Sequence, residues 1–396
     1  MSSLESALAA GSVLCLGLVV FAYIGYPILI WCFARLFGRN EVSPVIGEDQ
    51  LPSVSLLIAA HNEEKDVEQR ILNGLALDYP KGKLEIVIAS DGSTDRTNEI
   101  VRRYADRGVR LLDFPQRRGK SSVLNDAFDQ LSHPLVALSD ANTSFDRDSI
   151  KRLASWFADE SIGVVCGRLI LSDPATGKNV DSVYWKYETF LKICESKLGA
   201  LLGSNGGIYM MRKSLFKKIA PNTIVDDFVI PLSARQETGC RIIYDRSAVA
   251  YEETPASITS EFRRRSRIGA GGFQSIGQLW GLLHPKHGWV SFTFLSHKIL
   301  RWMCPFFLIG ALLMTLPLIH HPVFMALLLV QVVFYGSSLL AGYLPTEPRF
   351  LRYFKLGTMF TMMNAGLLVG FFRWLLWEQN GTWSRTERTP ETKPVA

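Results

Sequence analysis

Asp140 and Asn142 are the residues whose types and spacing most directly suggest chemistry. They stand one residue apart and follow the run Val136–Ser139. Carboxylate and amide oxygens at this spacing can face one hard cation, and Mg²⁺ and Mn²⁺ favour oxygen ligands shared with substrate phosphates. We therefore predict a site for Mg²⁺ or Mn²⁺ that neutralises a nucleotide-diphosphate leaving group. The alternative is an ordinary Asp-x-Asn surface turn.

Asp91 occupies a similar position after the run Val87–Ser90. A carboxylate at a strand end can accept hydrogen bonds from a base or a ribose. The alternative is a capping turn, in which Ser93 or Thr94 caps a helix that begins at Asp95. Capping does not explain an acid placed directly on the strand end, so we predict that Asp91 contacts a nucleotide.

Adjacent acids, Asp226 and Asp227, precede the apolar helical segment 228–234. Acids at a helix start often only cap the helix, because their negative charge is stabilised by its positive N-terminal end. They can equally supply a catalytic base. Further along, Arg264 and Arg267 are three residues apart and share one face of a predicted helix. That face suits phosphates and anionic lipid headgroups equally well.

The basic turn Arg117–Ser121 contains Gly119 and Lys120 and leads into a helical pattern. A phosphate-binding P-loop needs a glycine five residues before the Gly-Lys pair, where Phe114 stands, so that interpretation fails. A basic turn before a helix still suits a diphosphate. The alternative is a solvated basic loop.

The elements that must position these residues alternate between strand and helix. Short apolar runs predict buried parallel strands at 54–60, 84–90, 109–114 and 135–139. Helical patterns lie between them at 63–77, 95–104 and 120–131. This alternation predicts a doubly wound α/β fold, in which ligands bind beyond the carboxyl ends of the strands. Segments 61–64, 91–94 and 140–143 should therefore lie together.

Long apolar stretches at both ends of the chain predict membrane spans. They occupy residues 8–37, 303–319, 323–344 and 356–377. A bilayer core requires about 20 apolar residues in a helix, and a cleaved signal peptide would have a shorter core and a basic start. Buried helices of a soluble protein are the alternative for the later stretches.

The basic clusters predict that the middle of the chain lies in the cytoplasm, and the cysteine usage agrees with a reducing compartment. The net charge is +6, and basic clusters lie beside the spans, at Arg35 and Arg39 and within 263–267. Lysine and arginine beside spans mark the cytoplasmic side. The six cysteines are widely spaced and form no C-x-x-C pair, so neither a zinc site nor a disulfide scaffold is indicated.

In order along the chain, these segments resemble the family-2 inverting glycosyltransferases of GT-A fold, the membrane-bound group that includes cellulose, chitin and hyaluronan synthases. The resemblance covers about 52–267. It rests on VSLLIAAHNEE (54–64), IVIASDGSTDRT (86–97), RRGKSSVLNDAF (117–128), ALSDAN (137–142), GSNGGIYMMRKSLF (203–216), VDDF (225–228) and RRSRIGAGG (264–272). Each segment is weak alone, but the ordered set is specific.

The resemblance implies a role for each candidate residue. The nucleotide sugar, with uridine favoured, would contact Ala60, Glu63, Asp91, Lys120, Arg264 and Arg267. Ser204, Asn205 and Asp226 would line the acceptor and sugar pocket. Asp140 and Asn142 would correspond to the Asp-x-Asp metal motif, with Asn142 in place of the second acid. Asp227 would be the catalytic base.

The family's Gln-x-x-Arg-Trp motif falls on 264–268, where Arg267 is kept but Arg264 and Ile268 replace the Gln and the Trp. That departure leaves processive synthesis open. The expected domains are a first transmembrane helix (1–38), a linker (39–53), the glycosyltransferase domain (54–285), an interfacial helix with about three spans (286–378) and a polar tail (379–396).

The implied function is transfer of a sugar from a nucleotide-diphosphate donor to a growing polysaccharide or lipid-linked glycan. The reaction would be inverting and metal-dependent, at the cytoplasmic face of an inner or plasma membrane. The alternatives are transfer of one sugar to a lipid or polyprenyl-phosphate acceptor, and a non-catalytic subunit of a glycan export complex. Expected partners are the donor, the acceptor, the lipid bilayer and export proteins, but no nucleic acid.

Overall fold

The computed structural model describes residues 1–172, 183–253, 258–341 and 351–376. Contacts within the chain divide it into two units. Among the described residues, a helical unit comprises Met1–Leu29, Glu261–Ile276 and 294–376, and a sheet unit comprises Ile30–Ser260 and Gly277–Thr293.

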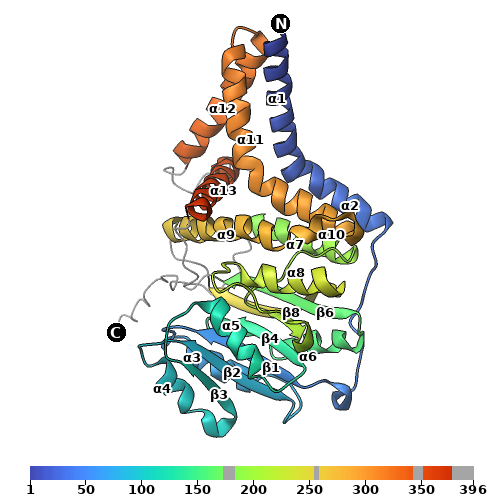
Figure 1. Ribbon diagram of the computed structural model, residues 1–396, viewed down its shortest axis with the longest axis vertical. Coiled ribbons are helices and arrows are strands. Elements are labelled where there is room, and N and C mark those ends of the chain that lie inside the picture. Colours follow the sequence, from blue (N-terminus) through green and yellow to red (C-terminus); the bar gives the residue numbers. More distant parts are fainter. Residues whose placement is uncertain (173–182, 254–257, 342–350, 377–396) are drawn as a thin grey trace. The chain divides into compact units, whose positions relative to one another are not determined.

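The sheet unit is organised around one eight-stranded sheet (Figure 1). The strands are β1 (Val54–Ala60), β2 (Leu84–Asp91), β3 (Val109–Phe114), β4 (Leu135–Asp140), β5 (Thr143–Phe145), β6 (Ile162–Ser172), β7 (Tyr209–Arg212) and β8 (Arg241–Glu253). Their order across the sheet is β3-β2-β1-β4-β7-β6-β8-β5. The first four pair in parallel, which confirms the predicted α/β core.

The second half of the sheet departs from the parallel pattern. Strand β7 runs antiparallel to both of its neighbours, β4 and β6, and β5 runs antiparallel to β8. Parallel neighbours require a crossover connection, usually a helix, whereas antiparallel neighbours such as β7 and β6 do not. The sheet is therefore mixed, and the predicted doubly wound parallel arrangement holds for its first half.

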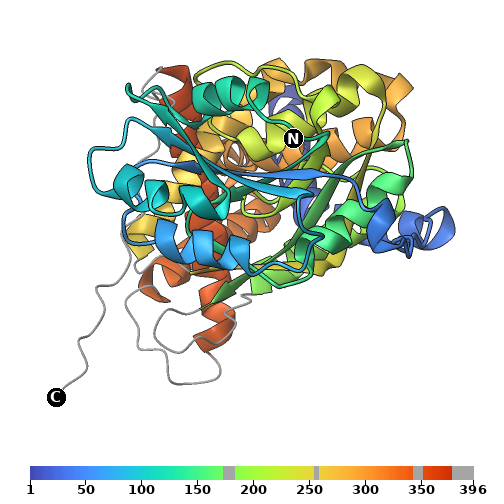
Figure 2. The ribbon, with the colours of Figure 1, turned by 90° about the horizontal axis from the view of Figure 1, so that it is seen from below.

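Helices cover both faces of the sheet, as the view in Figure 2 shows. They are α3 (Val67–Leu75), α4 (Thr97–Arg102), α5 (Lys120–Asp129), α6 (Ser149–Ser155), α7 (Val183–Lys197) and α8 (Asp226–Thr238). Every residue of β1 is buried, as expected for a strand covered on both faces. On one face, α3, α4 and α6 contribute Ile71, Val101 and Leu153 to a core that also contains Leu56 and Ile88.

The predicted start of the first helix, at Glu63, is four residues too early. Asn62 has a φ of 55°, which breaks the helical path, and α3 begins only at Val67. The backbone amides of this loop bond instead to side chains that follow β2. Those of Asn62, Glu63 and Glu64 donate to Ser93 Oγ (3.1 Å), Thr97 Oγ1 (2.8 Å) and Asp95 Oδ2 (3.1 Å).

The capping turn expected after Asp91 also differs in detail. Helix α4 begins at Thr97 rather than Asp95, and Asp95 itself bonds to the backbone amide of Thr97 at 3.0 Å. Ser93 is used by the neighbouring loop, and the amide of Thr94 donates to Asn62 Oδ1 at 2.8 Å. The two loops are therefore held together by reciprocal side-chain bonds.

The helical unit contains long apolar helices: α1 (Ser3–Val20), α11 (Leu300–Thr315), α12 (Pro322–Ala341) and α13 (Leu351–Leu375). A π-helical turn joins α1 to α2 (Tyr26–Leu36). Within the described residues, Ser3–Leu36 and Trp289–Leu318 have the length and composition to cross a membrane, whereas the apolar helix Pro322–Ser338 is shorter. Large apolar side chains on α1 and α12 face outward, including Leu14 at 62% exposure and Val330 at 64%.

Candidate active site

The carboxyl ends of β1, β2 and β4 meet at one edge of the sheet. Ala59 pairs with both Ala89 of β2 and Asp140 of β4, and Ala60 pairs with Ser90. Since Asp91 and Asp140 end their strands, the chain brings both acids to this edge, where open α/β sheets bind ligands.

Asp91 is fully buried, and its carboxylate binds the backbone of the basic turn. Oδ1 accepts a hydrogen bond from the amide of Arg118 at 2.7 Å, and Oδ2 accepts one from the amide of Gly119 at 2.8 Å. Gly119 has a φ of 91°, a conformation that favours glycine. Asp91 therefore fixes the turn that starts α5, in addition to any ligand contact.

Lys120, the first residue of α5, forms ion pairs with two acids of the site. Its Nζ lies 2.8 Å from Asp140 Oδ1 and 3.3 Å from Asp226 Oδ2. Burial lowers the pKa of the Lys120 ammonium, but the charges of Asp140 and Asp226 outweigh burial and raise it overall. Lys120 is therefore a charged link between the end of β4 and the start of α8.

Asp227 lies beside Asp140 at the start of α8. A Cβ added at Gly206 would lie 3.3 Å from Asp227 Oδ2 and 3.6 Å from Asp140 Oδ2, so the two carboxylates converge on one point. Asp227 Oδ2 also accepts the amide of Gly206 at 3.0 Å. The N-cap residue of α8 is Val225, which makes no side-chain cap, so the carboxylate of Asp227 bonds outside its own helix.

The electrostatic surroundings of Asp227 favour its protonated form. Burial raises the pKa of its carboxyl, and the charge of Asp226 raises it further, to about 6. Lys120 lowers this pKa, Asp140 raises it and Lys192 lowers it, each to a smaller extent than burial. A carboxyl with a pKa near neutrality can exchange a proton at physiological pH, as a general base must.

Ser204 and Asn205 form a turn against this acid. The amide and hydroxyl of Ser204 donate to the backbone oxygen of Asp227 at 3.0 Å and 2.7 Å. Asn205 Nδ2 donates to the carbonyl of Gly167 at 2.8 Å, and Lys192 of α7 donates to Asn205 Oδ1. Sequence reasoning missed Lys192, which belongs to no recognisable motif.

Asn142 contacts a second residue that sequence reasoning missed. Its Nδ2 donates to Glu252 Oε1 of β8 at 3.0 Å, next to the pairing of Thr143 with Glu252. A carboxylate can only accept, so Glu252 selects the amide nitrogen of Asn142 and turns its oxygen the other way. The spacing of 110 residues leaves no sequence signal for this pair.

A buried cation, Arg70 of α3, lies against Phe145 of β5, the strand that follows Asn142. Its Nη1 donates to Asn73 Oδ1 at 2.8 Å, and its guanidinium carbon lies 4.4 Å from the centre of the Phe145 ring. Burial lowers the pKa of Arg70, and the charge of Asp140 acts in the opposite direction. This arginine, also missed from sequence, supports the segment that carries Asp140 and Asn142.

The remaining candidates are dispersed. Ala60 is fully buried at the end of β1, and Glu63 lies in the following loop. Arg264 and Arg267 lie on α9 (Ile258–Gln278), in its portion within the helical unit, and Arg264 Nε pairs with Glu261 at 3.0 Å. The sheet unit thus gathers Asp91, Lys120, Asp140, Asn142, Ser204, Asn205, Asp226 and Asp227, whereas the two arginines belong to the other unit.

The mixed sheet, with acids at the carboxyl ends of its parallel strands, is a GT-A fold. The same fold is found in the mannosyltransferase PcManGT from Pyrobaculum calidifontis, solved with GDP-Man and Mn²⁺. That structure matches 93% of this chain and all of its own, with a TM-score of 0.69 and 21% identity. Residues 55–220 match the model of Glycosyl transferase family 2, so the chain carries a family-2 glycosyltransferase domain.

Curated relatives include polysaccharide synthases. The chain is 27% identical over 238 residues to the poly-beta-1,6-N-acetyl-D-glucosamine synthase of Staphylococcus aureus (strain COL). The aligned region covers 58% of this chain and 57% of that protein. It is 26% identical over 245 residues to the synthase of the same name from Staphylococcus epidermidis, covering 60% and 59%. The chain thus spans less than two thirds of the length of these relatives.

Proposed function

We propose that the protein transfers a sugar, with inversion, from a nucleotide-diphosphate donor to a growing polysaccharide or lipid-linked glycan. The observation that carries this proposal is the convergence of Asp227 and Asp140 on one point beside Gly206. One acid would take a proton from the acceptor, while the other would lie at the leaving diphosphate. Uridine is the favoured nucleoside, and a hexose or N-acetylhexosamine the favoured sugar.

The acids around Asp140 fit a divalent cation. Three acids, Asp140, Asp226 and Asp227, face two lysines, Lys120 and Lys192, so the acids outnumber the cations around them. The raised pKa of Asp227 has burial as its main cause, and the charge of Asp226 adds to it. Asp140 keeps 34% of its side chain exposed, so an ion can reach it. Asp140 and the oxygen of Asn142 would hold Mg²⁺ or Mn²⁺. When bound, the ion would neutralise the negative charge of the leaving diphosphate.

The proposed chemistry is a single displacement in which Asp227 acts as the base. The acceptor hydroxyl oxygen forms a bond to the anomeric carbon as the bond from that carbon to the diphosphate oxygen breaks. The proton of the hydroxyl passes to the carboxylate of Asp227, and the nucleoside diphosphate leaves with the bonding electrons. Attack opposite the leaving group inverts the anomeric configuration. The amide of Gly206 holds Asp227 Oδ2, which limits its rotation.

We also propose that the chain is an integral membrane protein with the sheet unit in the cytoplasm. Two helices have the length and composition of spans, and apolar side chains such as Leu14 and Val330 face outward. Such side chains need a hydrocarbon surrounding or a partner. The basic residues Arg35 and Arg39 follow the first apolar helix, on the side expected to be cytoplasmic.

Turnover of a panel of nucleotide sugars in membranes tests this proposal. Membranes containing the wild-type chain should release nucleoside diphosphate from at least one donor, with UDP-hexose and UDP-N-acetylhexosamine as the first candidates. Membranes containing the Asp227→Asn chain at equal abundance are the matched control. Absence of nucleotide binding by the purified chain would instead support a non-catalytic subunit of an export complex.

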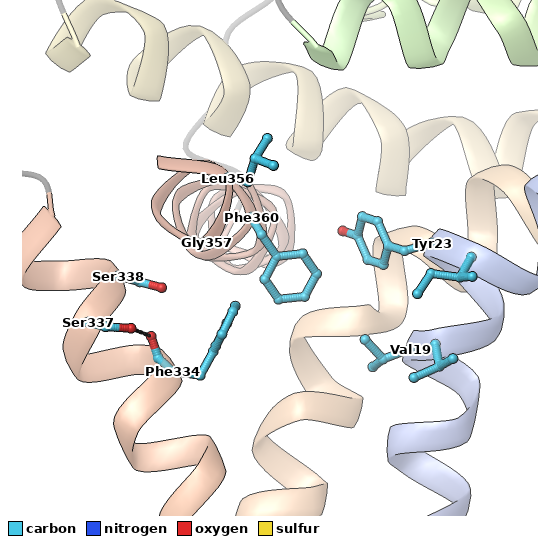
Figure 3. Close-up of a pocket in the computed structure, with 10 residues that line it drawn as sticks. Val19, Tyr23, Phe334, Ser337, Ser338, Leu356, Gly357 and Phe360 are labelled. Carbon is cyan, nitrogen blue, oxygen red and sulfur yellow. Dashed lines mark hydrogen bonds between the residues drawn. The ribbon is translucent and has the colours of Figure 1, made fainter. Parts of the chain in front are cut away.

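A second candidate function, transfer of one sugar to a lipid or polyprenyl-phosphate acceptor, is favoured by a cavity in the helical unit. About 550 Å³ of space lies between α1, α12 and α13, lined by Val19, Val20, Tyr23, Ile24, Phe334, Ser337, Ser338, Leu356, Gly357 and Phe360 (Figure 3). The buried Arg301 lies 5.4 Å above the Tyr23 ring. An apolar cavity suits a hydrocarbon chain, and Tyr23 is the lining residue that contacts Arg301.

Product analysis separates the two functions. A labelled donor should give a long polar product if the chain elongates a polysaccharide, and a short product soluble in organic solvent if the acceptor is a lipid. Ser337→Trp fills the cavity and should reduce only the second product, whereas Ser337→Ala is its control. A lipid product that is insensitive to Ser337→Trp would exclude this cavity as the acceptor site.

A further inference from the structure

Glu5, His320 and His321 form a cluster of metal-ligating side chains that the transferase reaction does not use. Glu5 lies in the first turn of α1, and the two histidines lie in the turn between α11 and α12. One ligand atom from each residue lies within 4.8 Å of the other two. Two imidazoles and one carboxylate are ligands that Zn²⁺ commonly takes in proteins.

The distances between the ligand atoms lie on either side of the separation around a tetrahedral ion. Glu5 Oε1 lies 3.0 Å from His320 Nε2, and Glu5 Oε2 lies 4.0 Å from His321 Nε2. Zinc–ligand bonds of about 2.0–2.1 Å at tetrahedral angles place ligand atoms about 3.4 Å apart. The two imidazole rings lie side by side, with centroids 4.2 Å apart, and one nitrogen of each lies within 4.8 Å of the other and of a Glu5 oxygen.

Two contacts join the helices that carry the cluster and orient Glu5. Ser12 Oγ and Thr315 Oγ1 form a buried hydrogen bond of 2.8 Å, which joins α1 to α11. The Glu5 carboxylate is also oriented by its own helix, because Oε2 accepts the amide of Ser2 at 2.7 Å. Oε1, which lies 3.0 Å from His320 Nε2, is then the oxygen for zinc, and the hydrogen bond to Oε2 orients the carboxylate, as is common around metal ions.

We propose that Glu5, His320 and His321 bind one Zn²⁺ ion, with water in the fourth position, and join the start of α1 to the α11–α12 turn. Imidazole ligands favour zinc over magnesium and calcium, which prefer oxygen. The alternative is an ion pair between the Glu5 carboxylate and a protonated histidine. The cysteine spacing gave no sign of this site, because it contains no cysteine.

Zinc titration of the purified full-length chain in detergent tests the proposal. The chain carries an affinity tag without histidines, and excess Mg²⁺ is present so that the acids near Asp140 do not compete for zinc. At a pH where histidine is neutral, one Zn²⁺ per chain should bind, and the melting temperature should rise with zinc concentration, because a ligand that binds only the folded state stabilises it.

Three variants and one control decide the result. Glu5→Gln, His320→Asn and His321→Asn should each weaken zinc binding at least about tenfold and remove the rise in melting temperature. His287→Asn, on a histidine of the sheet unit, should behave as wild type. Equal zinc affinity in wild type and all three variants, or no binding at millimolar zinc, would overturn the proposal in favour of an ion pair.

Discussion

Replacement of Asp227 by Asn removes the proposed base while keeping the shape of the side chain. The Asn amide oxygen can still accept the amide of Gly206, which bonds to Asp227 Oδ2 at 3.0 Å. The backbone oxygen of residue 227 continues to accept the bonds from Ser204. We therefore expect the variant to fold, insert and bind nucleotide as wild type does.

The loss of the base should slow transfer by about 10²–10⁴-fold, which corresponds to about 3–5 kcal/mol in the activation barrier. The free energy of unfolding of the Asp227→Asn variant should increase. The folded-state pKa of Asp227, about 6, lies above its ordinary value of 3.8, so ionisation of the carboxyl destabilises the fold increasingly as the pH rises from 3.8 to about 6. That penalty is about 3 kcal/mol and disappears below the unfolded pKa. Asn carries no charge and avoids it.

Initial rates with saturating donor, measured beside nucleotide affinity and melting temperature, test both effects. A slow variant that binds nucleotide and melts no lower than wild type supports the catalytic role. Asp226→Asn is the matched neighbour and should be milder. A nearly normal Asp227→Asn beside an inactive Asp226→Asn would show that the base is the other acid, and two active variants would place it elsewhere.

The pH dependence of kcat/KM follows from the same carboxyl. Only the ionised form accepts a proton, so the rate should fall as the pH decreases through about 6. The charge of Asp226 is the second contribution to the raised pKa, after burial. Asp226→Asn should therefore move the acid limb of the profile to lower pH. An unchanged profile would contradict the assignment of the limb to Asp227.

Three further predictions concern the cation, its ligands and the membrane. Asp140→Ala should abolish turnover and weaken nucleotide binding in the presence of metal; full activity in excess chelator would refute metal dependence. Glu252→Ala should free the Asn142 amide and weaken Mn²⁺ binding about 10–100-fold, which is the usual effect of losing a residue that supports a metal ligand. Glu253→Ala is the control and should leave Mn²⁺ binding unchanged; calorimetric titration with Mn²⁺ measures both variants. Cysteines placed at Ser2 and at Thr392, which lies outside the described residues, report by labelling in intact cells on which side of the membrane each end lies. The cysteine at position 2 should label from outside, and the one at position 392 should label from outside if three later segments cross and not if two do. Labelling of the 39–53 linker from outside would overturn the topology.

The first half of the sheet could be predicted because its strands are unbroken apolar runs. Segments 54–60 and 109–114 coincide with β1 and β3, and β2 and β4 each extend one residue beyond the prediction, to Asp91 and Asp140. These strands are buried on both faces, so their sequences carry a strong and local signal. The reversed strand β7 has no such signal, because its direction depends on pairing with β4 and β6.

The candidate site was predictable only where its residues follow strands or helix starts. Asp91, Asp140 and Asp227 were found from such positions, but the partners that orient them were not. Lys192, Glu252 and Arg70 reach the site through tertiary contacts, and nothing in their local sequence distinguishes them from ordinary charged residues. The backbone amides that bind Asp91 were also invisible, since any residue type can supply an amide.

The reciprocal bonds between the loop after β1 and the loop after β2 have a consequence for domain engineering. Asn62, Glu63 and Glu64 depend on side chains 31 to 34 residues away. A chimaera that takes segment 61–66 from a relative without segment 93–97 would leave both sets of donors and acceptors mismatched. The two segments should be exchangeable only as a pair, so recombination libraries that cut between them should recover few folded products unless both parents use the same polar residues there.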